Sequence, residues 1–175
     1  MKRNNTNSLI NGIIVETEAY SQEEEACHGY RKKSPSNEAL FGEPGRFYIY
    51  KSYGIHHCLN IVTDRENFAS GVLIRAVFIP NKNERLASGP GLVTRTFGID
   101  ISLNALKVLD NKYLWIAQRE AKIEHKDIVQ TTRIGITKAK NIKWRWYLKN
   151  SRSISKRALG DRTPKLKNSK NHFSF

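Results

Sequence analysis

The sequence is poor in the features that mark secreted, zinc-binding or membrane-spanning proteins. Among its 175 residues there are two cysteines, and Cys27 and Cys58 lack the paired spacing of a disulfide framework or a zinc knuckle. Its apolar runs, such as residues 71–79, have the length of a strand, whereas a membrane-spanning helix needs about 20 residues. The basic start, residues 1–5, is not followed by an apolar segment of signal-peptide length. We therefore expect a cytoplasmic protein with reduced thiols and no membrane partner.

Acidic residues are also scarce: 16 Asp and Glu stand against 30 Lys and Arg, which gives a net charge of +14. From Thr131 to the end there are thirteen basic residues and one acid, Asp161, so this segment carries +12 of that charge. A long polyanion is the natural partner of such a segment. Between residues 133 and 156 the basic residues are interleaved with aromatic ones, which favours a nucleic-acid face. Residues 157–175 fit a solubilising tail equally well.

The length suits one domain with a sizeable core. Apolar and β-branched stretches predict strands, and a turn that contains Gly89-Pro90-Gly91 opens a short helix. The predicted strands cover residues 12–20, 46–51, 55–63, 71–79, 133–137 and 144–148, and the helix covers residues 92–97. We predict an α+β fold, a single compact domain around a curved antiparallel β-sheet. It comprises residues 1–156, of which 1–11 are a short polar lead-in, and a basic, flexible tail follows over residues 157–175.

Two parts of the predicted sheet carry side chains suited to chemistry. Glu16 and Glu18 lie in an apolar strand, and burying a carboxylate is costly unless it is paired or used. The alternative is an edge strand on which both acids are solvated. Tyr53 lies at the tip of a tight hairpin, where an exposed aromatic side chain in a basic protein has the character of a wedge between bases. Tyr50, further back on the same hairpin, is placed to stack on a flipped base.

The pairs Cys27-His28 and His57-Cys58 raise the question of a metal site. Neighbouring residues on a strand face opposite ways, so one metal ion cannot easily collect both members of either pair. We therefore expect no metal and no other cofactor.

A set of short motifs, in a fixed order between residues 12 and 155, resembles the alkyladenine (3-methyladenine) DNA glycosylases. The motifs are Val15-Glu16-Thr17-Glu18-Ala19-Tyr20, Cys27-His28, Pro44-Gly45, Tyr48-Ile49-Tyr50, Tyr53-Gly54, Cys58-Leu59-Asn60-Ile61, Leu73-Ile74-Arg75-Ala76, Ser88-Gly89-Pro90-Gly91 and Arg133-Ile134-Gly135. Each is weak alone, but their order and spacing are specific. The sequence departs from the family pattern at Ser36, where an arginine is common, and in a shortened stretch between Pro80 and Ser88.

The resemblance implies a role for each matching residue. Glu18 would be the general base that activates water, and Arg75 would support that water. A β-hairpin would protrude into the minor groove, with Tyr53 filling the gap in the base stack, and no chemistry is assigned to Gly135. The flipped base would bind in a pocket formed by Tyr20, His28, Tyr50, Asn60 and Leu73.

The implied function is base-excision repair. The enzyme would flip alkylated or deaminated purines out of double-stranded DNA and hydrolyse the N-glycosidic bond, leaving an abasic site. It would be monofunctional, monomeric and nucleoid-associated. Two alternatives are a catalytically weakened nucleic-acid-binding protein on the same fold and an unrelated basic RNA-binding module, for which the C-terminal charge alone would suffice.

Overall fold

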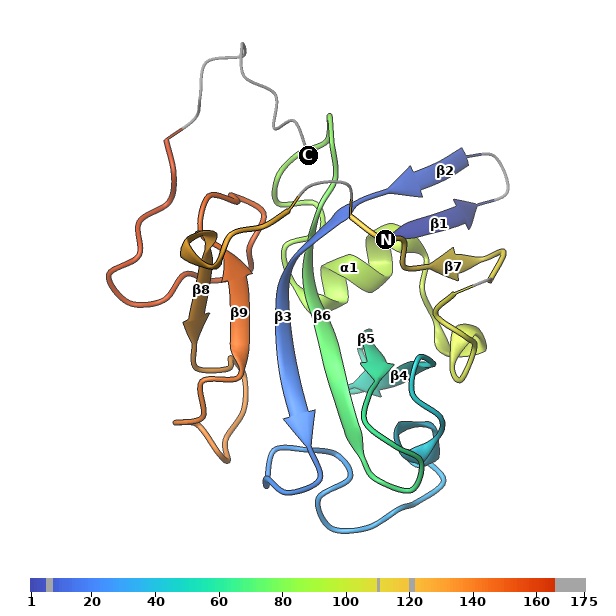
Figure 1. The fold of residues 1–175 in the computed structure, drawn as a ribbon. Coiled ribbons are helices and arrows are strands. Elements are labelled where there is room, and N and C mark those ends of the chain that lie inside the picture. Colours follow the sequence, from blue (N-terminus) through green and yellow to red (C-terminus); the bar gives the residue numbers. More distant parts are fainter. Residues whose placement is uncertain (6–7, 110, 120–121, 166–175) are drawn as a thin grey trace.

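The computed structural model describes residues 1–5, 8–109, 111–119 and 122–165 (Figure 1). Six strands form one antiparallel sheet in the order β4-β5-β6-β3-β9-β8. Their bounds are β3 Ile13–Ser21, β4 Phe47–Ser52, β5 His56–Val62, β6 Ser70–Phe78, β8 Ile128–Thr131 and β9 Arg145–Leu148. With only one short α-helix in the described chain, the predicted α+β class is confirmed.

A second, three-stranded sheet lies beside the first and was not predicted. It consists of β1 (Lys2–Asn5), β2 (Ser8–Asn11) and β7 (Leu114–Trp115), in the order β2-β1-β7. The interpretation of residues 1–11 as a polar lead-in was therefore wrong. Antiparallel pairing uses main-chain groups, so a polar stretch forms strands when a partner strand is at hand.

The strand predicted at residues 133–137 is also absent, and β8 lies just before it. Two local features explain the difference. Gly135 has φ +75°, outside the extended region, and the Ile134 N–H donates to a carboxylate of β3 instead of to a neighbouring strand. The segment is therefore a loop tied to the sheet by side chains.

The α-helix, α1 (Pro90–Phe97), packs against β5 and β6. Pro90 suits its first turn, where the missing N–H costs nothing, and Gly98 ends it in the left-handed conformation at φ +60°. The predicted helix over residues 92–97 is confirmed and begins two residues earlier. Three short 3-10 helices complete the described elements: η1 Glu38–Phe41, η2 Ile101–Leu103 and η3 His125–Asp127.

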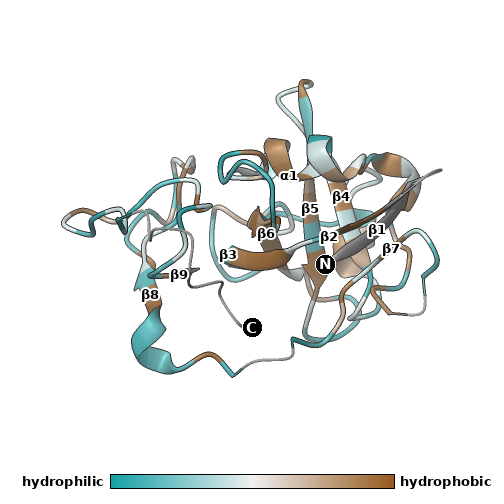
Figure 2. Ribbon diagram, turned by 90° about the horizontal axis from the view of Figure 1, so that it is seen from above, coloured by the Kyte–Doolittle hydropathy of each residue, from teal (hydrophilic) through white to brown (hydrophobic). Residues whose placement is uncertain are grey.

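The alternation of side chains on β4 gives the sheet two different faces. Phe47 and Ile49 point into the main core with α1, whereas Tyr48 and Tyr50 point to the opposite face, beside η1. The central strands β3, β5 and β6 are also rich in hydrophobic residues, whereas the segment leading into β8 is hydrophilic (Figure 2). One face carries the main core, and the other carries a smaller core cluster that includes Tyr48 and Leu40.

The pairing of β3 with β6 shifts register twice, once at Val15 and once at Arg75, and neither residue has a partner directly opposite. Ile74 and Val77 both face the main core although they are three residues apart, which a regular strand does not allow. An inserted residue of this kind bends the strand and redirects its side chain. On β6 that inserted residue is Arg75.

Candidate active site

A cavity of about 440 Å³ opens on the face of the sheet opposite α1, a volume typical of small-molecule sites. Most of the residues singled out in the sequence line it: Tyr20, His28, Tyr50, Tyr53, Asn60, Leu73 and Arg75. Ile134 and Gly135, from the loop after β8, also contribute to its wall. Glu18 does not line it. The carboxylate lies immediately behind the wall.

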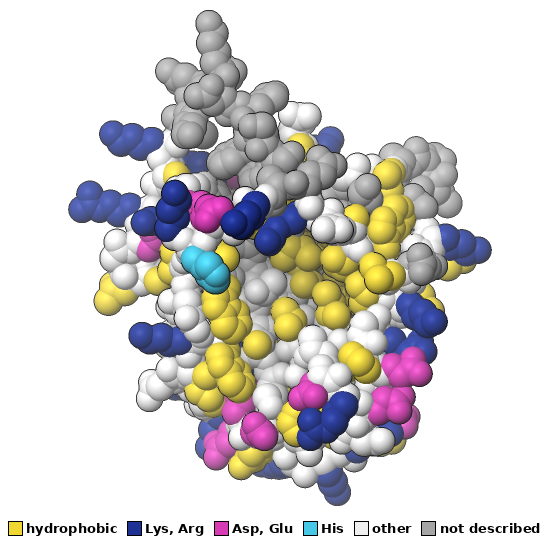
Figure 3. Space-filling view, viewed as in Figure 1, with side chains coloured by type: hydrophobic (Ala, Val, Ile, Leu, Met, Phe, Trp, Pro, Cys, Tyr) yellow, Lys and Arg dark blue, Asp and Glu magenta, His cyan; other side chains and the backbone are white. Residues whose placement is uncertain are grey.

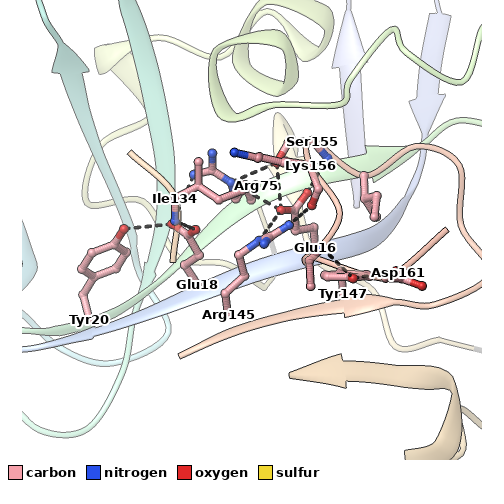
Figure 4. A network of polar contacts seen from close by, with 12 residues as sticks. Glu16, Glu18, Tyr20, Arg75, Ile134, Arg145, Tyr147, Ser155, Lys156 and Asp161 are labelled. Atoms are coloured by element: carbon pink, nitrogen blue, oxygen red, sulfur yellow. Dashed lines mark hydrogen bonds and ion pairs between the residues drawn. The ribbon is translucent and has the colours of Figure 1, made fainter. Parts of the chain in front are cut away.

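Glu18 is fully buried, and three donors point at its carboxylate (Figure 4). The Tyr20 hydroxyl donates to Oε2 at 2.9 Å, and Arg75 Nη1 donates to the same oxygen at 3.2 Å. The Ile134 main-chain N–H donates to Oε1 at 2.8 Å. A carboxylate accepts about four hydrogen bonds, so the donors in the described chain leave one acceptor direction, on Oε1. All three donor residues line the cavity, and they join the carboxylate to it.

Aromatic rings form one wall of the cavity. The His28 ring lies 4.2 Å from the Tyr50 ring, and its Nδ1 is 3.1 Å from the Tyr48 hydroxyl. Burial, followed by the neighbouring Glu18 carboxylate, raises the pKa of Tyr20, and burial also raises the pKa of Tyr50. Part of His28 is exposed to solvent, but the packing of its ring lowers its pKa from the ordinary value of 6.5. At neutral pH this wall is therefore uncharged.

Asn60 and Leu73 lie side by side on β5 and β6, where they pair across the sheet. The Asn60 side-chain nitrogen donates to the main-chain carbonyl of Tyr48 at 3.1 Å, which fixes the amide against the cavity wall. Both residues are buried, with 5% and 4% of their surface exposed. The expected pocket residues are thus brought together by the four adjacent strands β4, β5, β6 and β3 and by the loop after β3 that carries His28.

Tyr53 lies in the turn of the β4–β5 hairpin, and 86% of its surface is exposed. Its φ of +49° places a large residue in the left-handed region, which costs an ordinary side chain about 1 kcal/mol or more. Ile55, on the other side of Gly54, is also exposed, at 80%. The turn therefore carries two largely exposed apolar side chains.

The ion pair between Arg133 and Glu24 was not predicted from the sequence. Arg133 Nη1 and Nη2 donate to the two oxygens of Glu24 at 2.6 and 2.9 Å, and both side chains are almost fully buried. Arg133 also donates to the Ala19 carbonyl and lies 4.6 Å from the Tyr20 ring. It therefore fixes the loop that places Ile134 beside Glu18.

The basic segment between residues 133 and 156 divides into two groups. Arg133 and Arg145 point inward, because each is paired with a buried carboxylate, so the prediction that this whole segment faces nucleic acid was too broad. Its lysines are exposed: Lys138, Lys140, Lys143, Lys149 and Lys156. In Figure 3, Lys and Arg side chains follow the edge of the molecule over β8, β9 and the C-terminal segment.

Residues 151–161, which we call the C-terminal strap, run back over β9. Tyr147 donates a hydrogen bond of 2.6 Å to Asp161, which also pairs with Arg157 at 2.7 Å. The first residues of the predicted tail thus contact the domain, and residues 166–175 lie outside the described chain. The boundary between residues 156 and 157 stays a prediction.

In the described chain, Cys27 and Cys58 do not belong to any group of side chains that could hold a metal ion. Cys27 contacts the Ala69 carbonyl through its thiol, and burial raises the pKa of the thiols of Cys27 and Cys58. Among the described residues, no three His, Cys, Asp or Glu side chains are grouped as metal ligands would be. The same part of the chain contains no helix that is both long and apolar enough to cross a membrane.

The methylpurine-DNA glycosylase family matches residues 1–152 of the chain. A protein of Trichodesmium erythraeum is 43% identical over 173 residues, which cover 89% of this chain and 86% of that protein. A protein of Carboxydothermus hydrogenoformans is 44% identical over 161 residues, covering 85% of this chain and 84% of that protein. Both carry the provisional name 3-methyladenine DNA glycosylase.

The fold and the cavity together define an α+β protein with an aromatic-lined cavity in front of a buried carboxylate. The chain belongs to the methylpurine-DNA glycosylase family. The resemblance noted in the sequence is confirmed.

Proposed function

We propose that this protein is a monofunctional DNA glycosylase that removes 3-methyladenine and other alkylated or deaminated purines from double-stranded DNA. The observation that carries the proposal is the placement of Glu18. Its carboxylate is held by three donors behind an aromatic-lined cavity and retains one acceptor direction. Family membership and the relatives' names agree with this activity.

The chemistry required is hydrolysis of the bond between the purine and the sugar. An alkylated purine leaves readily because it is cationic or easily protonated, and the sugar carbon then resembles an oxocarbenium ion. Glu18 would stabilise that cation and accept a proton from the attacking water. The water oxygen bonds to the sugar carbon, while the electron pair of the broken bond leaves with the purine. Arg75 would hold the water and the carboxylate in place.

Base flipping would bring the purine to this carboxylate. The cavity is large enough for a flat bicyclic ring, and Tyr20, His28 and Tyr50 would stack against it, with Asn60 and Leu73 along its edge. Tyr53, exposed at the hairpin turn, would enter the gap left in the base stack. The exposed lysines beside β9 would contact phosphates, and one copy of the chain would suffice.

A base-release assay tests this proposal. The protein is incubated, in buffer containing EDTA, with methylated duplex DNA and with duplexes carrying one hypoxanthine or one ethenoadenine. Released bases are measured by chromatography and abasic sites by alkaline cleavage, with Glu18→Gln as the control. We expect release of 3-methyladenine that the control lacks. Lesion binding without any release would instead support the weakened nucleic-acid-binding protein, and activity that requires added metal would contradict the metal-free mechanism.

A further inference from the structure

Ser155 is the residue through which the C-terminal strap reaches the candidate active site (Figure 4). Its main-chain N–H donates to Glu16 Oε2 at 2.6 Å, and its hydroxyl donates to Glu16 Oε1 at 2.8 Å. The same hydroxyl accepts a hydrogen bond of 3.1 Å from Arg75 Nε. Ser155 lies beyond residue 152, where the family match ends.

Glu16 is fully buried and lies between two arginines. Arg145 Nε donates to its Oε1 at 2.7 Å, and Arg75 Nε lies 3.4 Å from the same oxygen. Glu16 therefore neutralises Arg145 and part of the charge of Arg75. A buried guanidinium stays in place only when its charge and its donors are matched.

Arg75 connects this cluster to Glu18. Its Nε faces Ser155 and Glu16, while its Nη1 donates to Glu18. A guanidinium is planar, so fixing Nε on one side fixes the direction of Nη1 on the other. Arg75 is the inserted residue of β6, a β-bulge, and has no residue opposite it on β3. The contacts of its Nε therefore define the direction of its side chain.

The strap holds Ser155 firmly from both sides. On one side, Ile154 accepts a hydrogen bond of 2.9 Å from Arg85 through its carbonyl. On the other side, the Lys156 carbonyl accepts a hydrogen bond from Arg145. Further along, Asp161 anchors the strap to Tyr147 on β9. The position of the Ser155 hydroxyl is therefore set by the folded domain.

We propose that Ser155, acting with Glu16, is a positioning residue that aims Arg75 at Glu18. This inference rests on the proposed glycosylase function and extends it to a segment outside the family match. Loss of the Ser155 hydroxyl leaves Arg75 Nε without its hydrogen bond and lets the guanidinium turn away from Glu18. The base-release step slows, while the cavity and the DNA-binding surface are unchanged.

The test compares Ser155→Ala with Ser153→Ala. Ser153 is a buried serine in the same strap, and among the described residues its hydroxyl has no hydrogen-bond partner. Single-turnover base release is measured at saturating enzyme on ethenoadenine duplex, together with lesion-DNA affinity and melting temperature. Small displacements of a catalytic group cost up to about 100-fold in rate. We expect a loss of about 10-fold or more in Ser155→Ala, with affinity unchanged, and wild-type rates in Ser153→Ala.

Two further variants separate positioning from general packing. Ser155→Thr keeps the hydroxyl and should restore most of the rate that Ser155→Ala loses. In an Arg75→Gln background, Ser155→Ala should have little further effect, because the group that it positions is already gone.

Equal rates for Ser155→Ala and Ser153→Ala, or fully multiplicative losses in the double variant, would overturn this inference while leaving the glycosylase function intact. A wild-type protein that releases no base would overturn both.

Discussion

The main-chain N–H of Ile134 donates a hydrogen bond of 2.8 Å to Oε1 of Glu18, across 116 residues of sequence. The carboxylate is thus held by the loop after β8 as well as by the side chains of Tyr20 and Arg75. Three separate parts of the chain meet on one functional group.

Replacing Glu18 with Gln should remove base release and leave duplex binding intact. The amide has nearly the shape of the carboxylate but cannot accept the proton of the attacking water, and loss of a general base costs about 10²- to 10⁴-fold in rate. Glu16→Gln should cost much less, because Glu16 is held by Arg75, Arg145 and Ser155 and reaches Glu18 only indirectly, through Arg75. Single-turnover rates and duplex titrations on both variants measure the difference. A larger effect at Glu16 would mean that the roles of the two acids are reversed.

Breaking the pair between Arg133 and Glu24 should destabilise the fold. Both side chains are almost fully buried, so Arg133→Met leaves an unpaired carboxylate inside and should cost about 3–5 kcal/mol. Thermal or urea unfolding measures this, and the double variant with Glu24→Leu should recover part of the loss. The exposed pair Lys33–Glu38 is the control, since Lys33→Met should change the free energy of unfolding by less than about 1 kcal/mol. Similar effects at the two pairs would contradict a stabilising role of the buried pair between Arg133 and Glu24.

Tyr53→Ser should leave the melting temperature unchanged, because the side chain is 86% exposed and its removal costs little packing. It should weaken binding to lesion or abasic DNA more than binding to intact duplex, because only a duplex with an extruded or missing base has a gap for the ring to fill. Tyr113→Ser, at another exposed tyrosine, is the matched control. A large fall in melting temperature, with equal losses of affinity on all DNAs, would exclude the wedge.

Affinity for undamaged duplex should fall steeply with salt, with a log–log slope of about −0.9 for each phosphate neutralised. Deleting residues 166–175 removes Lys167 and Lys170 but keeps Asp161, which anchors the strap. The slope should therefore become shallower by the contribution of up to about two phosphate contacts. Single-turnover release should be unchanged. If this deletion abolished release at saturating enzyme, residues 166–175 would belong to the active fold.

The preference for lesion DNA over undamaged duplex should decline as the pH falls below the ordinary histidine value of 6.5. Burial lowers the pKa of His28, so the neutral ring is the form expected to stack on a base, and protonation below that pKa would place a charge in the pocket. The titration uses the Glu18→Gln background, so that no base is released. His28→Phe should make the preference independent of pH in this range. An unchanged decline in that variant would assign the effect to another group.

The strands that line the cavity could be predicted because their side-chain pattern is local. The alternation at Tyr48 and Tyr50, and the short turn at Tyr53, are visible in a few consecutive residues. The same reasoning placed Glu18 correctly on a strand. The alternative of an edge strand with solvated acids was wrong, because Glu16 and Glu18 are both buried.

The features that the sequence could not show depend on distant partners. Arg133 and Glu24 are 109 residues apart, and Ser155 and Glu16 are 139 residues apart, so no local pattern reveals either contact. The bulge at Arg75 is equally invisible, because an inserted residue changes the pairing and not the composition of the strand. The arginines were assigned to a DNA-binding face because their positive charge alone does not show which way they point.

The contacts of Ser155 have a consequence for biosynthesis. The ribosome makes the chain from its N-terminus, so Glu16 and Arg75 are available long before the strap that connects them. A nascent chain that has formed β3 and β6 still carries its arginines and carboxylates without the serine that orders them. The proposed arrangement is therefore completed only after residue 155 has emerged, when the exposed lysines beside β9 are also present.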